Sequence, residues 1–86
     1  MPFSLRGDVS AAHSIDGMVL LDERTGRYWQ LNATAALVLR ALLCGATPGE
    51  AAKRLTGNHP ELSVEQADHD VAGLLTALRR AGLVMS

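Results

Sequence analysis

The fold is decided by residues 16–32, DGMVLLDERTGRYWQLN. The pair Asp16-Gly17 supplies the positive φ angle that a tight hairpin requires. Met18–Leu21 has the length and apolar character of a strand, a polar connection ending on glycine follows, and Arg27–Leu31 forms the next strand. A weaker strand signal lies around Val9–Ser14, because alanine is a poor strand former. This part of the chain predicts a three-stranded antiparallel meander.

From Asn32 onward the signals are those of helices. Asn32 is expected to cap a helix over roughly Ala33–Cys44, which Gly45 ends. The run Thr47-Pro48-Gly49-Glu50 is a capping box with proline at the first helical position, and it opens a short helix that ends near Leu55.

The last helix is predicted to be the longest, from the capping box Ser63-Val64-Glu65-Gln66 to Gly82. Arg79 and Arg80 lie in its last turn, where they complement the helix dipole, and Leu83-Val84 then returns to the core. Residues at helical spacing give it one apolar face: Val64, Ala67, Val71, Leu74, Leu75 and Leu78.

Three strands followed by three helices predict an α+β fold. Because a sheet with one apolar face must be covered, the helices are expected to form a layer against it. The order favours a winged helix-turn-helix, with a three-stranded antiparallel sheet followed by three helices. We see no linker and no repeat, so residues 1–86 are expected to form a single domain.

Composition narrows the class of partner. The chain has 48% hydrophobic and 20% charged residues, which is typical of a globular domain. Eight basic and nine acidic residues give a net charge of -1, whereas nucleic-acid binding usually needs a basic excess. No signal segment or apolar run of membrane-spanning length is present, so we expect a cytoplasmic protein with neither nucleic-acid nor membrane partners.

Catalytic and metal chemistry find little support in the sequence. The three histidines, His13, His59 and His69, are scattered, and Asp68-His69-Asp70 points its side chains about 100° apart on a helix. Cys44, the single cysteine, follows an apolar run and is expected to be a buried structural thiol. We therefore predict a protein that is not an enzyme and has no catalytic residue, metal or cofactor.

A winged-helix regulator is the alternative from another class. The helix that would enter the major groove is the long one, yet its first two turns carry Glu65, Asp68 and Asp70, whose carboxylates would face phosphate. The strand Arg27–Leu31 offers a different activity. As the last strand of a meander it is expected at a sheet edge, where an unprotected strand suits addition of a peptide as a further strand.

The side chains of that strand are expected to divide between two faces. Trp29 and Leu31 are interpreted as core anchors, whereas Tyr28 and Gln30 are expected on the other face, beside Met18 and Leu20 of the neighbouring strand.

Residues 16–36 resemble a known family through the pattern Leu-Asp-x-x-Thr-Gly-x-Tyr-x-x-Leu-Asn, and residues 70–84 resemble its C-terminal helix. The family comprises the precursor-peptide recognition elements, which are similar to the small chaperone of pyrroloquinoline quinone biosynthesis. The stand-alone proteins of lasso-peptide clusters are the branch that the chain resembles most.

The resemblance implies a protein that binds the leader segment of a ribosomally made precursor by strand addition. It also implies a partner leader peptidase, a cysteine protease to which the leader is presented, and a separate ATP-dependent macrolactam cyclase. Service to another modified-peptide pathway, including quinone-cofactor biosynthesis, remains the alternative within the family. The implied peptide-binding residues are Arg27, Tyr28, Trp29, Gln30 and Leu31 of the strand, and Asp70, Val71, Leu74, Ala77 and Leu78 of the long helix.

Overall fold

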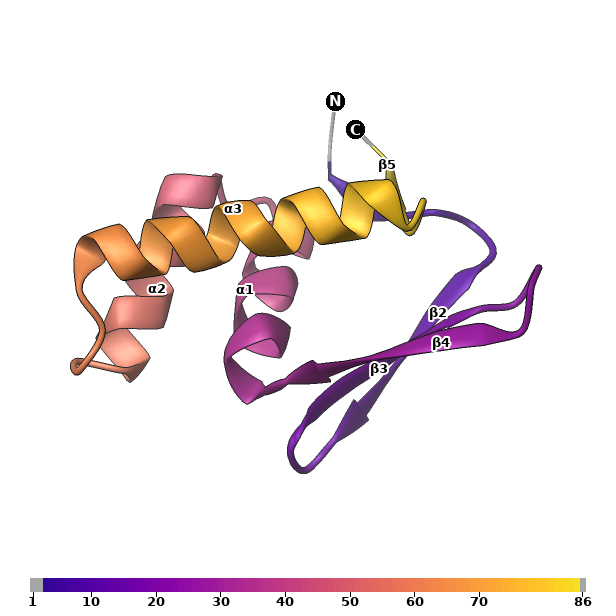
Figure 1. The fold of residues 1–86 in the computed structure, drawn as a ribbon, viewed down its shortest axis with the longest axis horizontal. Coiled ribbons are helices and arrows are strands. Elements are labelled where there is room, and N and C mark those ends of the chain that lie inside the picture. Colours follow the sequence, from indigo (N-terminus) through magenta and orange to yellow (C-terminus); the bar gives the residue numbers. More distant parts are fainter. Residues whose placement is uncertain (1–2, 86) are drawn as a thin grey trace.

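The computed structural model describes residues 3–85, and it has the predicted order of a meander followed by three helices (Figure 1). The α+β fold class is confirmed. In chain order the elements are β1 (Ser4–Leu5), β2 (Val9–Ser14), β3 (Gly17–Asp22), β4 (Arg27–Asn32), α1 (Ala33–Leu43), α2 (Pro48–Asn58), α3 (Val64–Arg80) and β5 (Val84–Met85).

The main sheet is antiparallel, with strand order β2-β3-β4. Ser14 pairs with Gly17, so residues 15 and 16 form a two-residue hairpin loop. Gly17 has a φ of 152°, and a Cβ atom there would lie 1.9 Å from the carbonyl oxygen of Leu31. Glycine at this position therefore allows β3 and β4 to approach at the end of the sheet next to α1.

A second glycine closes the connection from β3 to β4. Gly26 has a φ of 77°, and its amide donates to the carbonyl of Asp22 at 2.8 Å. The Asp22 carboxylate accepts from the Arg24 amide at 3.0 Å, which fixes the start of the same turn. These bonds set the register in which Asp22 lies opposite Arg27.

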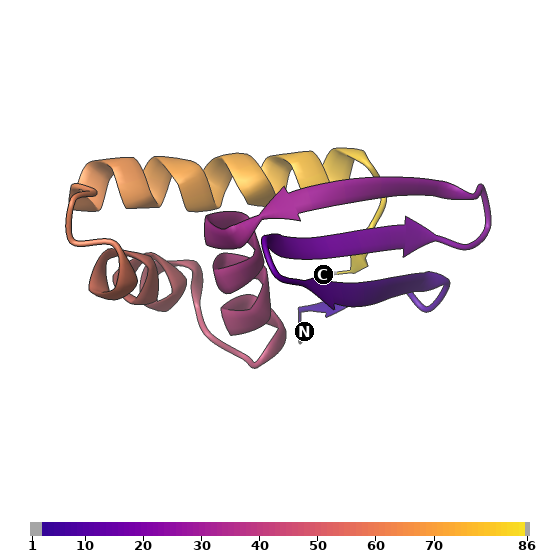
Figure 2. The same cartoon turned by 90° about the horizontal axis from the view of Figure 1, so that it is seen from below.

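Helix α1 lies at the centre and belongs to two hydrophobic clusters. Ala36 and Leu39 pack with Met18 and Leu20 of β3, whereas other side chains of α1 pack with α2 and α3. Leu20 and Leu39 have no exposed surface, and burying each contributes about 1.5–3 kcal/mol. Helix α1 thus joins the sheet to the helical layer, and Leu78 of α3 reaches the same cluster as the sheet residues (Figure 2).

A small two-stranded sheet brings the chain ends together, and the sequence analysis did not find it. Leu5 of β1 pairs with Val84 of β5. Arg6 next to it forms ion pairs with Asp8 at 2.6 Å and with the buried Asp22 at 3.2 Å. This polar cluster ties the first residues to the turn between β3 and β4.

The predicted helix caps are mostly confirmed. Asn32 accepts from the Ala35 amide at 2.9 Å, and both bonds of the Thr47–Glu50 capping box are present. The Ser63 hydroxyl accepts from the Gln66 amide at 3.1 Å, but the reciprocal bond is not among the hydrogen bonds of residues 3–85.

Three details differ from the sequence-based expectation. Helix α2 continues beyond Leu55 to Asn58, whose side chain donates to the carbonyl of Arg54 at 2.9 Å. Val64 is 66% exposed because it is the first residue of α3 and extends beyond the layer. Cys44 is exposed rather than buried, since it follows the exposed Arg40 by one helical turn.

Candidate functional site

Strand β4 is an edge strand of the three-stranded sheet, and within residues 3–85 no strand pairs with its second edge. The amide of Glu23, which directly follows β3, donates to the carbonyl of Asp8. The main-chain groups of odd-numbered residues in β3 therefore form their hydrogen bonds with β2. Even-numbered residues of β3 therefore bond β4, where their partners are odd-numbered: Met18 lies opposite Leu31 and Leu20 opposite Trp29. It follows that the main-chain N–H and C=O groups of Tyr28 and Gln30 point away from the sheet, at its open edge.

The side chains of β4 alternate between two faces with the same period. Trp29 and Leu31 are half-buried and pack against the cluster that contains Met18 and Leu20. Tyr28, which is 67% exposed, and Gln30 occupy the face that the helices leave open.

The expected neighbours of Tyr28 and Gln30 were wrong. In the observed register Tyr28 lies opposite Leu21 and Gln30 opposite Val19, while Met18 and Leu20 point into the core. The strand signal alone did not fix the register, and a shift of one residue exchanges the two faces.

At the start of β4, Arg27 shares the helix-facing side of the strand with Trp29. Its guanidinium carbon lies 5.6 Å from the centre of the Trp29 ring, which is within the range of a cation–π contact. Arg27 itself is exposed. The half-buried indole therefore has a positive charge at its solvent side.

In the view from below, the axes of α3 and β4 are nearly parallel (Figure 2), and the end of β4 lines one hollow together with α3. Of its five residues implied by the family resemblance, Asp70 and Ala77 are exposed and Leu74 is half-buried. Val71 and Leu78 are only 2% and 3% exposed and lie in the core. A ligand on the surface would reach Asp70, Leu74 and Ala77. Val71 and Leu78 instead pack in the core and hold the helix in place.

A hollow of about 320 Å³ lies where the end of β4 meets α1 and α3. Val38 and Leu55, both buried, belong to its apolar wall. Its lining consists of Asn32, Thr34, Ala35, Val38, Leu55, His69, Asp70, Gly73 and Leu74. The expected site contained only Asp70 and Leu74 of these.

The additional residues at the hollow come from the end of β4 and from all three helices. Asn32 and Thr34 mark the start of α1, and the N-cap signal at Asn32 could have pointed to them. Gly73 follows His69 by one turn of α3, and with no Cβ it leaves open space beside the hollow. The packing of α3 against α1 brings the two groups together, and no sequence spacing encodes that packing.

The ionisable groups with shifted pKa values serve the fold. The guanidinium of Arg6 holds the pKa of the Asp8 carboxyl below its usual value through a hydrogen bond, and that bond also raises the pKa of Arg6. At the N-terminus of α2, the Thr47 amide lowers the pKa of Glu50. None of these three groups lies in the hollow or on β4.

Within residues 3–85, no group of three histidine, cysteine, aspartate or glutamate residues could hold a metal ion. None of the described helices has the length and apolar character needed to cross a membrane. The geometry is that of a winged helix-turn-helix domain with an open sheet edge, a hollow with polar and apolar walls, and a helix beside them.

The sequence of this domain matches a known protein family. Residues 17–84 match the family described as Coenzyme PQQ synthesis protein D (PqqD), and the chain belongs to it. The matched range begins at Gly17, the first residue of β3, and includes β4 and all three helices. No curated protein matches the chain significantly.

Two solved structures share the fold over almost the whole chain. One is described as lasso peptide synthetase B1 complexed with the leader peptide; it is 43% identical, with a TM-score of 0.90 and full coverage of both chains. The other, TbiB1 in complex with the TbiA(beta) leader peptide, is 25% identical, with a TM-score of 0.85, and the match covers 96% of this chain and 95% of that one.

Proposed function

We propose that this protein is a non-catalytic recognition protein that binds the leader segment of a lasso-peptide precursor. The leader would add to β4 as a fourth strand and lie between β4 and α3. Main-chain bonds to Tyr28 and Gln30 would supply affinity, while side chains of the leader would contact the apolar floor and the hollow.

One observation carries this proposal: the open edge of β4 lies beside apolar surface that the core does not fully cover. Trp29, Leu31 and Leu74 are all half-buried, and all three pack against the same cluster. Backbone donors and acceptors are therefore available next to a floor for alternate side chains of an added strand. The two solved relatives, both in complex with leader peptides, support this reading.

The charges on α3 disfavour the regulator alternative. Glu65, Asp68 and Asp70 are exposed in the first turns of the helix. Their carboxylates are stable in water but would repel the phosphates of DNA. The net charge of -1 agrees with this.

Presentation to an enzyme completes the proposed role. We propose that the bound leader is delivered to a cysteine-protease leader peptidase, and that a macrolactam cyclase acts on the same precursor. A leader held along β4 would keep the rest of the precursor outside the domain. The outer face of the sheet, with Tyr28 67% and Leu21 37% exposed, remains accessible in such a complex.

Fluorescence polarisation with the labelled leader of the precursor encoded beside the gene tests the proposal. We expect a dissociation constant between nanomolar and micromolar, which corresponds to about 8–12 kcal/mol. A duplex DNA from the upstream region serves as the second probe. Salt-sensitive binding to the DNA without binding to the leader would refute the proposed recognition function and support a DNA-binding regulator.

A further inference from the structure

The two ends of the surface between β4 and α3 carry opposite charge. Among residues 3–85, ion pairs involve Arg6, Arg24 and His59, so Arg27, Arg80 and Asp70 are in none of them. All three are exposed. Their charges are therefore available to a ligand.

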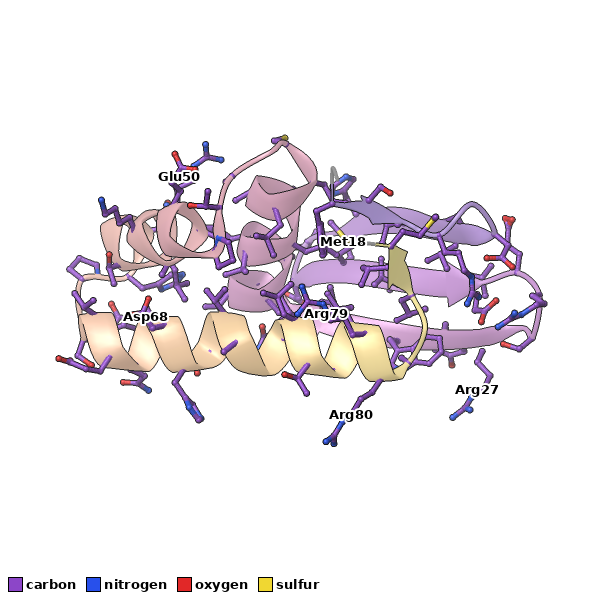
Figure 3. The ribbon with its side chains drawn as sticks, turned by 90° about the horizontal axis from the view of Figure 1, so that it is seen from above. Met18, Arg27, Glu50, Asp68, Arg79 and Arg80 are labelled. Carbon is purple, nitrogen blue, oxygen red and sulfur yellow. The ribbon has the colours of Figure 1, made fainter. Side chains whose placement is uncertain are left out.

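The positive end combines one residue from each element. Arg27 begins β4 on its helix-facing side, and Arg80 ends α3. Figure 3 shows both side chains projecting from the same side of the molecule, whereas Arg79 projects from the opposite side of α3. Arg80 also lines a shallow depression on α3 together with Gly73 and Ala77, which connects it to the hollow.

The negative end lies at the hollow. Asp70 is there with Asn32, the last residue of β4, and its neighbours include the uncharged oxygens of Asn32 and Thr34. His69 is the one residue of the hollow that can carry positive charge, and it shares the adjoining depression with Arg80. Asp68, two residues before Asp70, projects toward α2 and lies in a different depression with Lys53.

The two charged ends are spaced to suit one short strand. The six residues of β4 span about 20 Å, and the ten steps from Asp70 to Arg80 rise about 15 Å along α3. A strand of about six residues on β4 would thus reach from one charged end to the other.

We propose that charge complementarity fixes the direction and register of the bound peptide. The inference rests on the proposed function. The peptide carries an acidic side chain where Arg27 and Arg80 lie and a basic side chain where Asp70 lies. Main-chain pairing by itself along an edge strand tolerates shifts of two residues, so charges at both ends help to select one register.

Two charge reversals with matched controls test the inference, using the same labelled leader in fluorescence polarisation. Arg80→Glu should weaken binding about three- to tenfold at low salt, because an attractive exposed pair becomes repulsive. Arg79→Glu is the control. It changes the net charge and the interaction with the helix dipole in the same way, but it lies one residue away on the opposite side of α3. Likewise Asp70→Lys should weaken binding, while Asp68→Lys should change it less than twofold.

Reciprocal changes in the peptide complete the test. Replacing the acidic residue of the leader by lysine should restore binding to the Arg80→Glu protein and weaken binding to the wild type. Equal affinities of the Arg80→Glu and Arg79→Glu proteins, or tight binding of a leader without an acidic residue at that end, would overturn the inference. A wild-type protein that binds no leader at all would overturn the proposed function instead.

Discussion

Replacing Gln30 by proline should strongly weaken peptide capture and leave the fold intact. The Gln30 N–H points to the open edge of β4, so its removal takes no bond from the ladder with β3. Trp29, the residue before it, already has the extended backbone that a following proline requires. An added strand, by contrast, would lose a donor and meet the proline ring at the same place.

The magnitude follows from the bond that is lost. A peptide carbonyl left without its donor between β4 and α3 costs about 1–3 kcal/mol. The ring also displaces the incoming backbone, and we assign it a further contribution of about 1 kcal/mol. A total of about 2–4 kcal/mol weakens binding roughly 30- to 1,000-fold. The folded protein should lose no more than about 1 kcal/mol, which lowers the thermal midpoint by about 4–8 °C.

Two measurements and one matched variant decide the outcome. Circular dichroism follows thermal unfolding, and fluorescence polarisation follows leader binding. Ala11→Pro is the control because Ala11 is exposed on β2, the opposite edge of the same sheet, where its N–H also points away from β3. A folded Gln30→Pro protein that binds the leader as tightly as the wild type, or an Ala11→Pro protein that loses binding equally, would refute strand addition at β4.

Three further substitutions test the fold and the surface beside it. Gly17→Ala should cost at least about 2 kcal/mol in urea unfolding, because the Cβ would lie 1.9 Å from the Leu31 carbonyl oxygen at a φ of 152°; an unchanged midpoint would contradict the close approach of β3 and β4. Gly73→Ala should stabilise α3 by about 0.5–1 kcal/mol, since no atom lies within 4 Å of the new methyl, yet weaken leader binding severalfold by narrowing the hollow; tighter binding would place the leader elsewhere. Asp8→Asn should flatten the acid side of a plot of thermal midpoint against pH: the lowered pKa of Asp8 means that its stabilising contribution is present at neutral pH and is lost as the pH falls through that pKa, so an unchanged acid slope would assign the loss to other carboxylates.

The sequence predicted most of the architecture because its local signals have local causes. The Asn32 and Thr47 caps and the glycine turns each require a particular side chain or φ angle at one position, and the structure contains them. Their order along the chain then leaves few ways to cover the sheet.

The site was predicted less well because it depends on packing between distant segments. Val71, Leu74 and Leu78 belong to one apolar stripe of α3, but only the position of α1 and the sheet determines that Leu74 lies at its margin. The pairing of β1 with β5 joins residues about 80 positions apart, through two-residue strands too short to give a signal. The prediction for Cys44 was wrong for a related reason. The residues before Cys44 are apolar, but Cys44 itself does not lie on the buried face of α1.

The alternation along β4 separates folding from binding. Trp29 and Leu31 direct their backbone toward β3 and their side chains toward the core. Both their main-chain hydrogen bonds and their side-chain packing therefore stabilise the fold. Tyr28 and Gln30 direct their backbone to the open edge and their side chains to the uncovered face, so the fold uses them for little besides strand geometry. Tyr28 and Gln30 can therefore change with the ligand while the sheet is kept, whereas a change at Trp29 or Leu31 alters the core and the floor of the binding surface together.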